Sequence, residues 1–531
     1  MANTLNQAIL QLSRRTEQTD DSVLASTFVS AGSLFEAIIS KDHQILYGRR
    51  GTGKTHVLKV LCENRQKVGD IAIYIDLRTI GSNGGIYQDS SIPLVERGTR
   101  LLCDVFEYIY NELVNLVVQG KYESNLDFKT ASESIEIFRE GISNIYIAGN
   151  HEKTLSNTNQ ESTRKIGSAS ISLSRAPEAK LATEKSSILE NQQESIEKVV
   201  GPQRTRFHFG TVGQSLGRVI DGLGSRMWLL LDEWSDLPPD LQPLLADMLR
   251  RTVMPLKKTT LKIGAIEKRS NFIESDGKGG YLGFELGADI SADMRLDDFM
   301  VFGNDVNESR SFFADLFSKH INNILSEQDL PLIESSQAFI DSAFTQNAAF
   351  DDLVRAGEGN PRDALNIAIS AARKAGDNKI SRPNIRDAAR NWYLSDKEKN
   401  VKINAQAGPV LNWIIEIVIG KRKARAFMLA QGVQSDNELI SFLYDTRVIH
   451  LAKTNISSKD NPGTRYDAYV LDYGCYVHLI NTQAEPKGMF EVEDDAGEEG
   501  YVDVPKDDYR SIRRAILDMK DFETSLAKSL E

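Results

Sequence analysis

Short apolar runs alternate with segments of helical spacing through the N-terminal half of the chain. Five runs predict buried strands: Gln44 to Tyr47, Ile71 to Asp76, Met227 to Leu231, Leu261 to Ile266 and Phe299 to Phe302. Apolar residues recur at helical spacing between them, as in Leu101 to Val118 and Leu241 to Arg251. Strands that alternate with helices predict an α/β fold, in which helices cover a parallel sheet to give an αβα core over residues 21–308.

The pattern changes twice after this core. Residues 309–400 show helical periodicity alone, which predicts a helical lid. Residues 401–485 begin with an apolar helical face and end with two strand-like runs, Val448 to Leu451 and Tyr466 to Leu471, separated by a polar loop. Helices followed by a two-stranded ribbon predict a winged-helix domain at the C-terminal end.

Three segments carry weaker patterns. Residues 1–20 are polar, and residues 119–205 contain few large apolar side chains that could offset the cost of ordering the chain. We therefore expect residues 119–205 to be a flexible insertion in the core, or a segment that binds a partner. Residues 486–531 contain an acidic run, Glu491 to Glu499, and a terminal helical pattern from Tyr509 to Leu530, which predict a linker and a helix.

One motif between a predicted strand and a predicted helix indicates nucleotide chemistry. It matches the phosphate-binding pattern G-x-x-x-x-G-K-[ST] at every fixed position, and its residues, with the next one, are Gly48, Arg49, Arg50, Gly51, Thr52, Gly53, Lys54, Thr55 and His56. Its glycines let backbone N–H groups point at phosphates, beside the positive end of the following helix. Lys54 would reach the β- and γ-phosphates, and the Thr55 hydroxyl would bind Mg²⁺. A plain Gly-rich turn is the alternative.

A second motif supplies acid at the end of the buried strand Met227 to Leu231. Asp232 and Glu233 follow five apolar residues directly. In nucleotide hydrolysis, Asp232 would hold Mg²⁺ through water and Glu233 would polarise the attacking water. The alternative is a strand end with two solvated acids.

A third motif, Gly359-Asn360-Pro361-Arg362, begins a helix in the predicted lid. Pro361 suits a first helical turn, and Arg362 would project toward a γ-phosphate when the lid closes. A capped helix with a surface arginine is the alternative.

Composition narrows the class of protein. The chain has 531 residues, a net charge of −12 and three distant cysteines, Cys62, Cys103 and Cys475, without metal-ligand spacing. No apolar run approaches the length of a membrane span, and residues 1–20 lack the apolar core of a secretory signal. We expect a cytoplasmic protein that does not bind membranes.

With these motifs in this order, the chain resembles the AAA+ ATPases, and within them the origin-recognition and replication-initiator branch. Gly48 to Thr55 corresponds to Walker A, Leu229 to Glu233 to Walker B, and Gly359 to Arg362 to the sensor 2 phrase, over about residues 20 to 480. The resemblance implies ATP and Mg²⁺ as cofactors, bound between the core and the lid. The absence of the Asn-Lys-x-Asp tetrad of guanine readers agrees with ATP. Val29 to Phe35 is a candidate for the base pocket or an ordinary core helix.

The resemblance also implies that an arginine from a neighbouring subunit completes hydrolysis, and hence that the protein self-associates. Arg295 lies in the equivalent stretch, with Arg250 and Arg251 as competitors. The strand Leu261 to Ile266 resembles the sensor 1 strand but leads into Glu267, Lys268 and Arg269, where a small polar residue is usual. Either hydrolysis is slow, or Ser270 or Asn271 positions the water.

Charge in the predicted winged helix leaves the partner open. The segment Ser435 to Ser441, which would read DNA, carries two acids and no base. A nearby run, Lys421 to Arg425, holds four basic residues, and Lys453, Lys459 and Arg465 lie near the predicted wing. Two functions follow: an ATP-dependent oligomeric switch or loader on duplex DNA, or a nucleotide-gated switch that binds a protein partner, as in signalling or anti-phage defence ATPases. The sensor 2 phrase disfavours a metabolic kinase.

Overall fold

The computed structural model describes most of the chain. The described residues are 2–13, 20–80, 87–118, 128–142, 208–296, 306–457, 463–480 and 516–530, except for positions 31, 276, 278, 423, 433 and 436, together with short strands within 145–205 and 492–500. They form two units, one of residues 1–142 and 208–531 and one of residues 143–207. No helix among these residues is long and apolar enough to cross a membrane.

A five-stranded parallel sheet forms the centre of the first unit. Its strands are β1 (Gln44–Tyr47), β2 (Ile71–Asp76), β7 (Met227–Asp232), β8 (Thr259–Ala265) and β11 (Ser291–Arg295), in the order β11-β1-β8-β7-β2. Every neighbouring pair is parallel. The predicted α/β core is therefore present, and β1, β7 and β8 are buried along their whole length.

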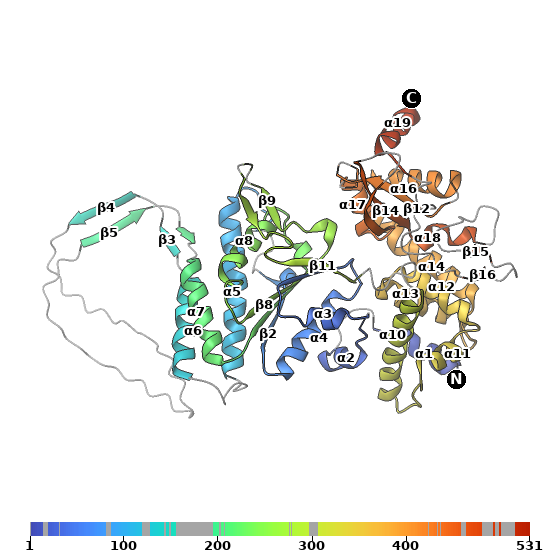
Figure 1. Ribbon diagram of the computed structural model, residues 1–531, viewed down its shortest axis with the longest axis horizontal. Coiled ribbons are helices and arrows are strands. Elements are labelled where there is room, and N and C mark those ends of the chain that lie inside the picture. Colours follow the sequence, from blue (N-terminus) through green and yellow to red (C-terminus); the bar gives the residue numbers. More distant parts are fainter. Residues whose placement is uncertain are drawn as a thin grey trace. The chain divides into compact units, whose positions relative to one another are not determined.

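Helices cover the sheet because each connection between parallel strands must cross it. Helix α4 (Lys54–Lys67) contacts β2, β7 and β8, and helices α2 (Asp21–Thr27) and α3 (Leu34–Ile38) lie nearby. On the other side of the sheet are α5 (Leu94–Val118), α6 (Phe128–Ile142), α7 (Phe209–Leu223) and α8 (Gln242–Thr252) (Figure 1). The carboxyl ends of β1 and β7 lead directly into the two predicted nucleotide motifs.

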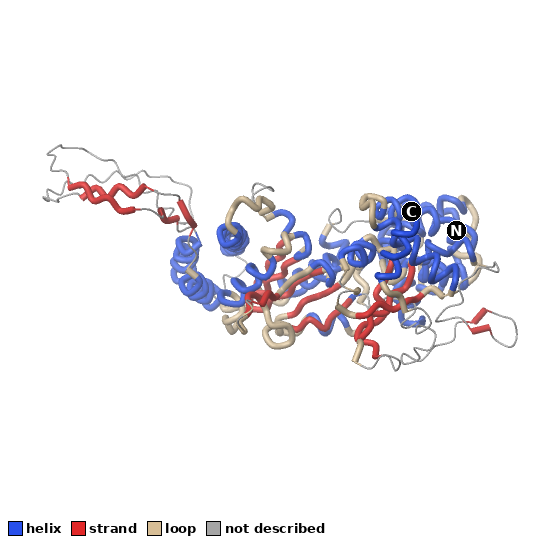
Figure 2. Tube along the Cα trace, turned by 90° about the horizontal axis from the view of Figure 1, so that it is seen from above, coloured by secondary structure: helices blue, strands red, loops and turns tan. Residues whose placement is uncertain are grey.

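The predicted lid is helical as expected (Figure 2). It consists of α10 (Val306–Glu327), α11 (Ser336–Ala343), α12 (Asn347–Gly357), α13 (Pro361–Ala375) and α14 (Arg382–Trp392), followed by the π-helical turn η5 (Tyr393–Lys397) and α15 (Glu398–Val401). Asn360 caps α13, its side chain accepting a hydrogen bond from the Asp363 amide. The sensor 2 phrase thus begins a helix, as predicted.

The C-terminal domain has the strands and helices of a winged helix. It contains α16 (Ala407–Ile415), η6 (Glu416–Lys421), β12 (Ala426–Ala430), α17 (Glu438–Asp445), β13 (Ile449–Ser457) and β14 (Arg465–Leu471), then α18 (Tyr473–Tyr476) and η7 (Val477–Leu479). The strands form an antiparallel sheet in the order β12-β14-β13. The ribbon is therefore three-stranded, because β12, which the sequence did not predict, pairs with β14.

Two predictions about chain segments are wrong, and a third lies outside the described residues. The segment 1–20 is not merely polar, because α1 (Ala2–Leu10) buries Leu5 and Ile9, and Asn6 donates to the carbonyls of Gly376 and Asn378 in the lid at 2.6 and 2.8 Å. The insertion 119–205 is too wide, because α6 packs against α5 and α7. The strand next to β1 is β11, whereas the predicted strand Phe299 to Phe302 lies outside the described residues.

The remainder of the insertion forms the second unit. It contains two antiparallel pairs, β3 (Ile145–Ile147) with β6 (Gln203–Thr205) and β4 (Asn150–Leu155) with β5 (Ser195–Val200). Residues 156–194 and most of the acidic run lie outside the described residues. At the C-terminus, α19 (Met519–Leu530) covers the later part of the predicted helix, whereas residues 509–515 lie outside the described residues, and Phe522 packs against Trp413 with ring centroids 5.6 Å apart. A short hairpin, β9 (Ile273–Ser275) with β10 (Tyr281–Gly283), follows β8.

Candidate nucleotide site

The phosphate-binding loop and the acidic strand end meet at the carboxyl edge of the sheet. Thr55, at the start of α4, donates its hydroxyl to Asp232 Oδ2 at 2.6 Å. Asp232 is fully buried at the end of β7, and its other oxygen accepts the Glu233 amide at 2.9 Å. Gly264 on β8 leaves room for this carboxylate, because a Cβ there would lie 2.6 Å from Asp232 Oδ1. The two motifs therefore form one site.

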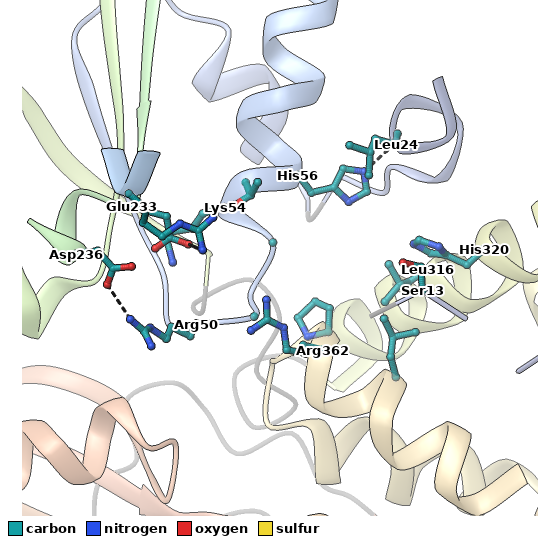
Figure 3. Close-up of a pocket in the computed structure, with 16 residues that line it drawn as sticks. Ser13, Leu24, Arg50, Lys54, His56, Glu233, Asp236, Leu316, His320 and Arg362 are labelled. Atoms are coloured by element: carbon teal, nitrogen blue, oxygen red, sulfur yellow. Dashed lines mark hydrogen bonds and ion pairs between the residues drawn. The ribbon is translucent and has the colours of Figure 1, made fainter. Parts of the chain in front are cut away.

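A pocket beside these residues contains further predicted groups from the loop and the lid. Its lining includes Lys54, Glu233 and Arg362, and it also contains Arg50, Gly51, Gly53, Thr55, His56, Arg78, Asp236, Ser13, Leu24, Leu316, His320, Pro361 and Leu365. In Figure 3, Glu233 and Lys54 lie together at one end, and His56, Leu24 and His320 lie toward the other. The pocket thus has a charged end and a more apolar end.

Side chains of the phosphate-binding loop donate hydrogen bonds to the loop's own backbone carbonyls. Lys54 Nζ donates to the carbonyl oxygens of Gly48 and Arg49 at 2.8 and 3.2 Å, and Thr52 Oγ1 donates to the Arg49 carbonyl at 2.9 Å. Gly51 and Gly53 have φ of +91° and +97°, a region that glycine adopts without strain. Gly48, Arg49 and Thr52 do not line the pocket.

Groups around Glu233 shift the pKa of its carboxyl. Its backbone is left-handed, with φ of 56°, which directs the chain away from β7 immediately after Asp232. Burial raises the pKa of Glu233, and the neighbouring Asp232 raises it further, whereas Lys54 and Arg78 lower it. Arg78 Nη1 lies 3.6 Å from Glu233 Oε1. A raised pKa makes the Glu233 carboxylate a stronger base than an ordinary glutamate.

Two side chains in this site were missed by the sequence analysis. Arg78 follows β2 and pairs with both Asp76 and Glu233. Tyr74 lies within β2 and donates its hydroxyl to Asp232 Oδ2 at 2.9 Å, which together with burial raises the pKa of the tyrosine. Tyr74 belongs to β2 and Arg78 to the turn directly after it, and the sequence of this strand stands out only for its apolar character. The position of β2 beside β7 brings them to the site.

The donor set at Asp232 fits a magnesium ion. Mg²⁺ prefers hard oxygen ligands and retains several waters, so it needs only one or two protein oxygens besides phosphate. The Thr55 hydroxyl and the Asp232 carboxylate supply two adjacent oxygens. Among the described residues, no three or more His, Cys, Asp or Glu side chains form a group that could hold a metal ion.

The predicted arginine fingers form ion pairs and do not line the pocket of their own chain. Arg295 Nη2 is 2.5 Å from Glu267 Oε1, while Arg250 and Arg251 each pair with Asp247 at 2.7 Å. None of the three arginines is among the lining residues.

Ser270 and Asn271, the candidates for the sensor 1 role, form hydrogen bonds outside the pocket. Ser270 Oγ lies 2.8 Å from Ser235 Oγ, and the Asn271 amide donates to Gln242 at 2.6 Å. Neither residue lines the pocket. The segment proposed for the base pocket, Val29 to Phe35, does not line it either, and the nearby lining residue is Leu24, whose carbonyl lies 2.7 Å from His56 Nε2.

The winged-helix domain contacts the core through opposite charges. Arg269 Nε lies 3.3 Å from Asp445 at the end of α17, and Lys268 Nζ lies 3.9 Å from Asp467 on β14. Burial raises the pKa of Asp445 to about 6, against the opposing effect of Arg269. Lys268 and Arg269 therefore contact the winged helix, and Glu267 is balanced by Arg295.

The predicted basic surface is partly internal. Arg425 is buried and donates to the Tyr476 hydroxyl at 3.1 Å, and Lys421 lies 3.0 Å from Glu416. Lys423 and Lys459 lie outside the described residues, and Arg465 donates to the Asn455 carbonyl at 3.3 Å. Arg425 thus belongs to the domain interior and not to an exposed DNA-binding face.

A family model and several solved structures are similar to this chain. Residues 12–83, which contain the phosphate-binding loop, match the family model described as ORC-CDC6-like. No curated protein sequence matches the chain. The solved structures similar to it include the Aeropyrum pernix Orc1 protein in complex with DNA, at 12% identity over 87% of this chain and 96% of that one, with a TM-score of 0.29. Cdc6p from Pyrobaculum aerophilum is also 12% identical, over 86% and 94% of the chains, with a TM-score of 0.30.

Proposed function

We propose that this chain, which is ORC-CDC6-like in residues 12–83 and has an AAA+ fold, binds ATP and Mg²⁺ between its αβα core and its lid. It hydrolyses the nucleotide slowly or when a partner stimulates it. ATP binding assembles subunits, and hydrolysis releases them. The chain acts as a nucleotide-dependent oligomeric switch or loader associated with duplex DNA.

The observation that carries the proposal is the hydrogen bond between Thr55 and Asp232. It brings the ends of the two motifs within 2.6 Å, beside a pocket lined by Lys54, Glu233 and Arg362. Mg²⁺ would be held by Thr55 Oγ1 and, directly or through water, by Asp232, and would neutralise the charge of the phosphates. This constellation is what nucleotide hydrolysis requires, since phosphoryl transfer depends on positioning and charge stabilisation.

Each end of the pocket has a role in this proposal. The phosphates would lie on Gly51, Gly53 and Lys54, with the Lys54 ammonium leaving the Gly48 and Arg49 carbonyls to reach them. The base would lie at the end that contains Leu24, His56, Leu316, His320 and Leu365. Burial lowers the pKa of His320 to about 4, so its ring is neutral and suits an uncharged base.

Glu233 would accept a proton from the attacking water. Its raised pKa places it closer to neutral pH than an ordinary glutamate, which favours proton transfer. Arg362 lines the same pocket from the lid and would stabilise charge that develops on the γ-phosphate. Arg295 would act on the site of a neighbouring subunit, since it does not line the pocket of its own chain.

A protein-gated switch without direct DNA binding is the second candidate. It is favoured by the burial of Arg425, which removes one cation from the predicted DNA-binding face. A face with fewer cations binds phosphates less strongly.

ATP turnover by the wild-type chain, with and without duplex DNA, tests the proposal. Lys54→Ala should lose nucleotide binding, because the phosphates lose their cation. Glu233→Gln should retain binding, and turnover should fall on the order of 10² to 10⁴-fold, the usual contribution of a general base. Light scattering with ATP and with ADP should report a larger particle with ATP.

The results separate the two functions. Turnover that DNA stimulates, and that both variants abolish, supports the DNA-associated switch. Turnover that requires Lys54 and Glu233 but ignores DNA supports the protein-gated switch. An absence of ATP binding by the wild-type chain would refute both.

A further inference from the structure

A buried chain of polar contacts links the phosphate-binding loop to the winged-helix domain. Arg49, the second residue of the loop, has an exposed fraction of only 3% and points away from the pocket. Its Nη2 donates to the Glu358 carbonyl of the lid at 2.7 Å, and its Nη1 contacts His450 Nδ1 on β13. One loop arginine therefore touches both C-terminal domains.

The partners of His450 determine its hydrogen-bonding state. Arginine can only donate, so His450 Nδ1 must accept. His450 Nε2 lies 3.1 Å from Asp472 Oδ2, and a carboxylate accepts, so Nε2 carries the proton. Burial and the Arg49 charge lower the pKa of His450 to about 4, which agrees with a neutral ring. Only a side chain that accepts at one end and donates at the other can bridge these two groups.

The chain of contacts continues from Asp472 to the lid helix that holds the sensor 2 arginine. Lys397 Nζ lies 2.5 Å from Asp472 Oδ2 and 2.9 Å from Asp363 Oδ2, and all three side chains are almost completely buried. Asp363 directly follows Arg362, which lines the pocket. The contacts therefore begin at the loop, pass through the winged helix and end beside the pocket again.

The lid also holds two loop carbonyls directly. Asn360 Nδ2 donates to the Arg50 carbonyl at 2.7 Å, and the Arg362 amide donates to the Gly51 carbonyl at 3.3 Å. A Cβ on Gly51 would lie 2.6 Å from Asn360 Oδ1, so the approach is close. The loop conformation thus depends on groups in the lid and the winged helix.

We propose that His450, a winged-helix residue that does not line the pocket, is a positioning residue of the nucleotide site. By holding Arg49, it fixes the loop that receives the phosphates and couples nucleotide affinity to docking of the winged helix. The inference rests on the proposed ATP site. A loop held in place before binding loses less conformational entropy on binding, so removal of the anchor weakens affinity. Linkage requires the reverse effect, in which nucleotide strengthens docking of the winged helix.

The test measures ATP affinity of full-length variants in Mg²⁺. His450→Phe keeps the ring volume but removes both nitrogens, and should weaken binding about tenfold, within the usual range of coupling between sites. Arg49→Met should weaken it similarly, and the double variant should add little, because both changes break the same contact. His450→Gln should restore most of the affinity, since its amide both accepts and donates. His478→Phe, a change at an exposed histidine of the same domain, is the matched control.

Hydrogen exchange supplies the reciprocal measurement. ATP should slow exchange in β13 of the wild-type chain, and Arg49→Met should abolish that change. Additive effects of Arg49→Met and His450→Phe, failure of His450→Gln to restore affinity, or unchanged affinity in His450→Phe would overturn the inference. Thermal melting identifies any variant that fails to fold. If His450→Phe does not fold, Arg49→Met, which breaks the same contact from the other side, decides: unchanged ATP affinity in that variant would overturn the inference. If wild type binds no ATP, the proposed function fails, whereas unchanged affinity in His450→Phe refutes the coupling alone.

Discussion

Arg295 and Glu267 form an ion pair, with Arg295 Nη2 2.5 Å from Glu267 Oε1. Glu267 lies immediately after β8 and Ile266, where a small polar sensor residue was expected, and Arg295 is the predicted arginine finger. The pair is partly exposed, with 29% and 25% of the two side chains accessible. The charge of Glu267, which would repel a phosphate, is therefore balanced by Arg295, the residue that would act on a neighbouring subunit. To stabilise a transition state in another subunit, Arg295 would have to exchange this partner for phosphate.

Arg295→Ala should reduce ATP turnover without weakening ATP binding, if Arg295 acts across a subunit interface. An arginine finger is worth 10³ to 10⁵ in turnover in well-studied systems, and we expect a loss of roughly 10²-fold or more. Turnover should be measured over a range of protein concentration, since only the assembled wild-type protein would have the finger in place.

A mixing experiment checks the direction of this effect. Lys54→Ala keeps Arg295 but lacks a working site, whereas Arg295→Ala keeps the site but lacks the finger. Equal mixtures should regain part of the wild-type turnover if the arginine acts in trans. No regain, or weaker ATP binding by Arg295→Ala alone, would count against a finger, and Arg218→Ala, at an exposed arginine of α7, serves as the matched control.

Asp232→Asn should remove most of the benefit of Mg²⁺ for ATP binding. The amide keeps the size of the side chain but loses the charge, and Mg²⁺ binds carboxylates far better than amides. Affinity for ATP should be compared in Mg²⁺ and in EDTA, and the ratio should fall toward one. Gly264→Ala provides a second variant, because its Cβ would press on Asp232 without removing the carboxylate. An unchanged ratio in both variants would show that the metal is held elsewhere.

Arg78→Met should move the acidic limb of the pH–rate profile to higher pH. Arg78 lies 3.6 Å from Glu233 and helps to lower the pKa of that carboxyl, against burial and Asp232, which raise it. A general base must be deprotonated, so the rate rises with pH through its pKa. Removing the cation raises this pKa further, and the rate should therefore rise only at higher pH. A limb that stays in place would mean that another group controls it.

The sequence predicted the core of the fold because local signals mark it. β1, β2 and β7 are apolar runs, β1 and β7 lead into motifs with chemical meaning, and all three strands appear where they were expected. β11 was not predicted because it lies at the edge of the sheet, where the sequence Ser-Ala-Asp-Met-Arg need not be uniformly apolar. Helix α6 was missed because its apolar positions are few, although Ile135 and Phe138 are buried against neighbouring helices.

Some contacts of the candidate site could be predicted from the sequence, and others could not. Thr55 and Asp232 could be paired from sequence because each ends a motif at the same sheet edge. Tyr74 carried no such signal, since a tyrosine within an apolar strand is usually a core residue. The contact between Arg49 and His450 joins residues that are far apart in sequence, and only the packing of three domains creates it. The same packing explains why Arg425, predicted as a surface cation, is buried.

Glu358→Gln should stabilise the protein at pH 8 more than at pH 5. Glu358 is buried at the end of α12, and burial raises the pKa of its carboxyl from 4.5 to about 7, although Arg425 opposes the change. Between these values the folded state keeps a proton that the unfolded state releases, so stability falls as pH rises toward 7. Glutamine carries no charge to bury, and the gain at pH 8 should reach up to about 3 kcal/mol, one pKa unit being worth 1.36 kcal/mol.

Chemical unfolding at pH 5 and pH 8 measures this difference, with the surface variant Glu398→Gln as the control. The opposite behaviour is expected of Asp363, where Lys397 and Arg447 overcome burial and lower the pKa from 3.8 to about 2. Its contribution is complete above pH 3.8 and is lost as the pH falls toward 2, so Asp363→Asn should destabilise the protein at both pH 5 and pH 8. If Glu358→Gln destabilises equally at both pH values, the carboxylate is needed in its charged form, and the buried network contains an ionised Glu358 paired with Arg425.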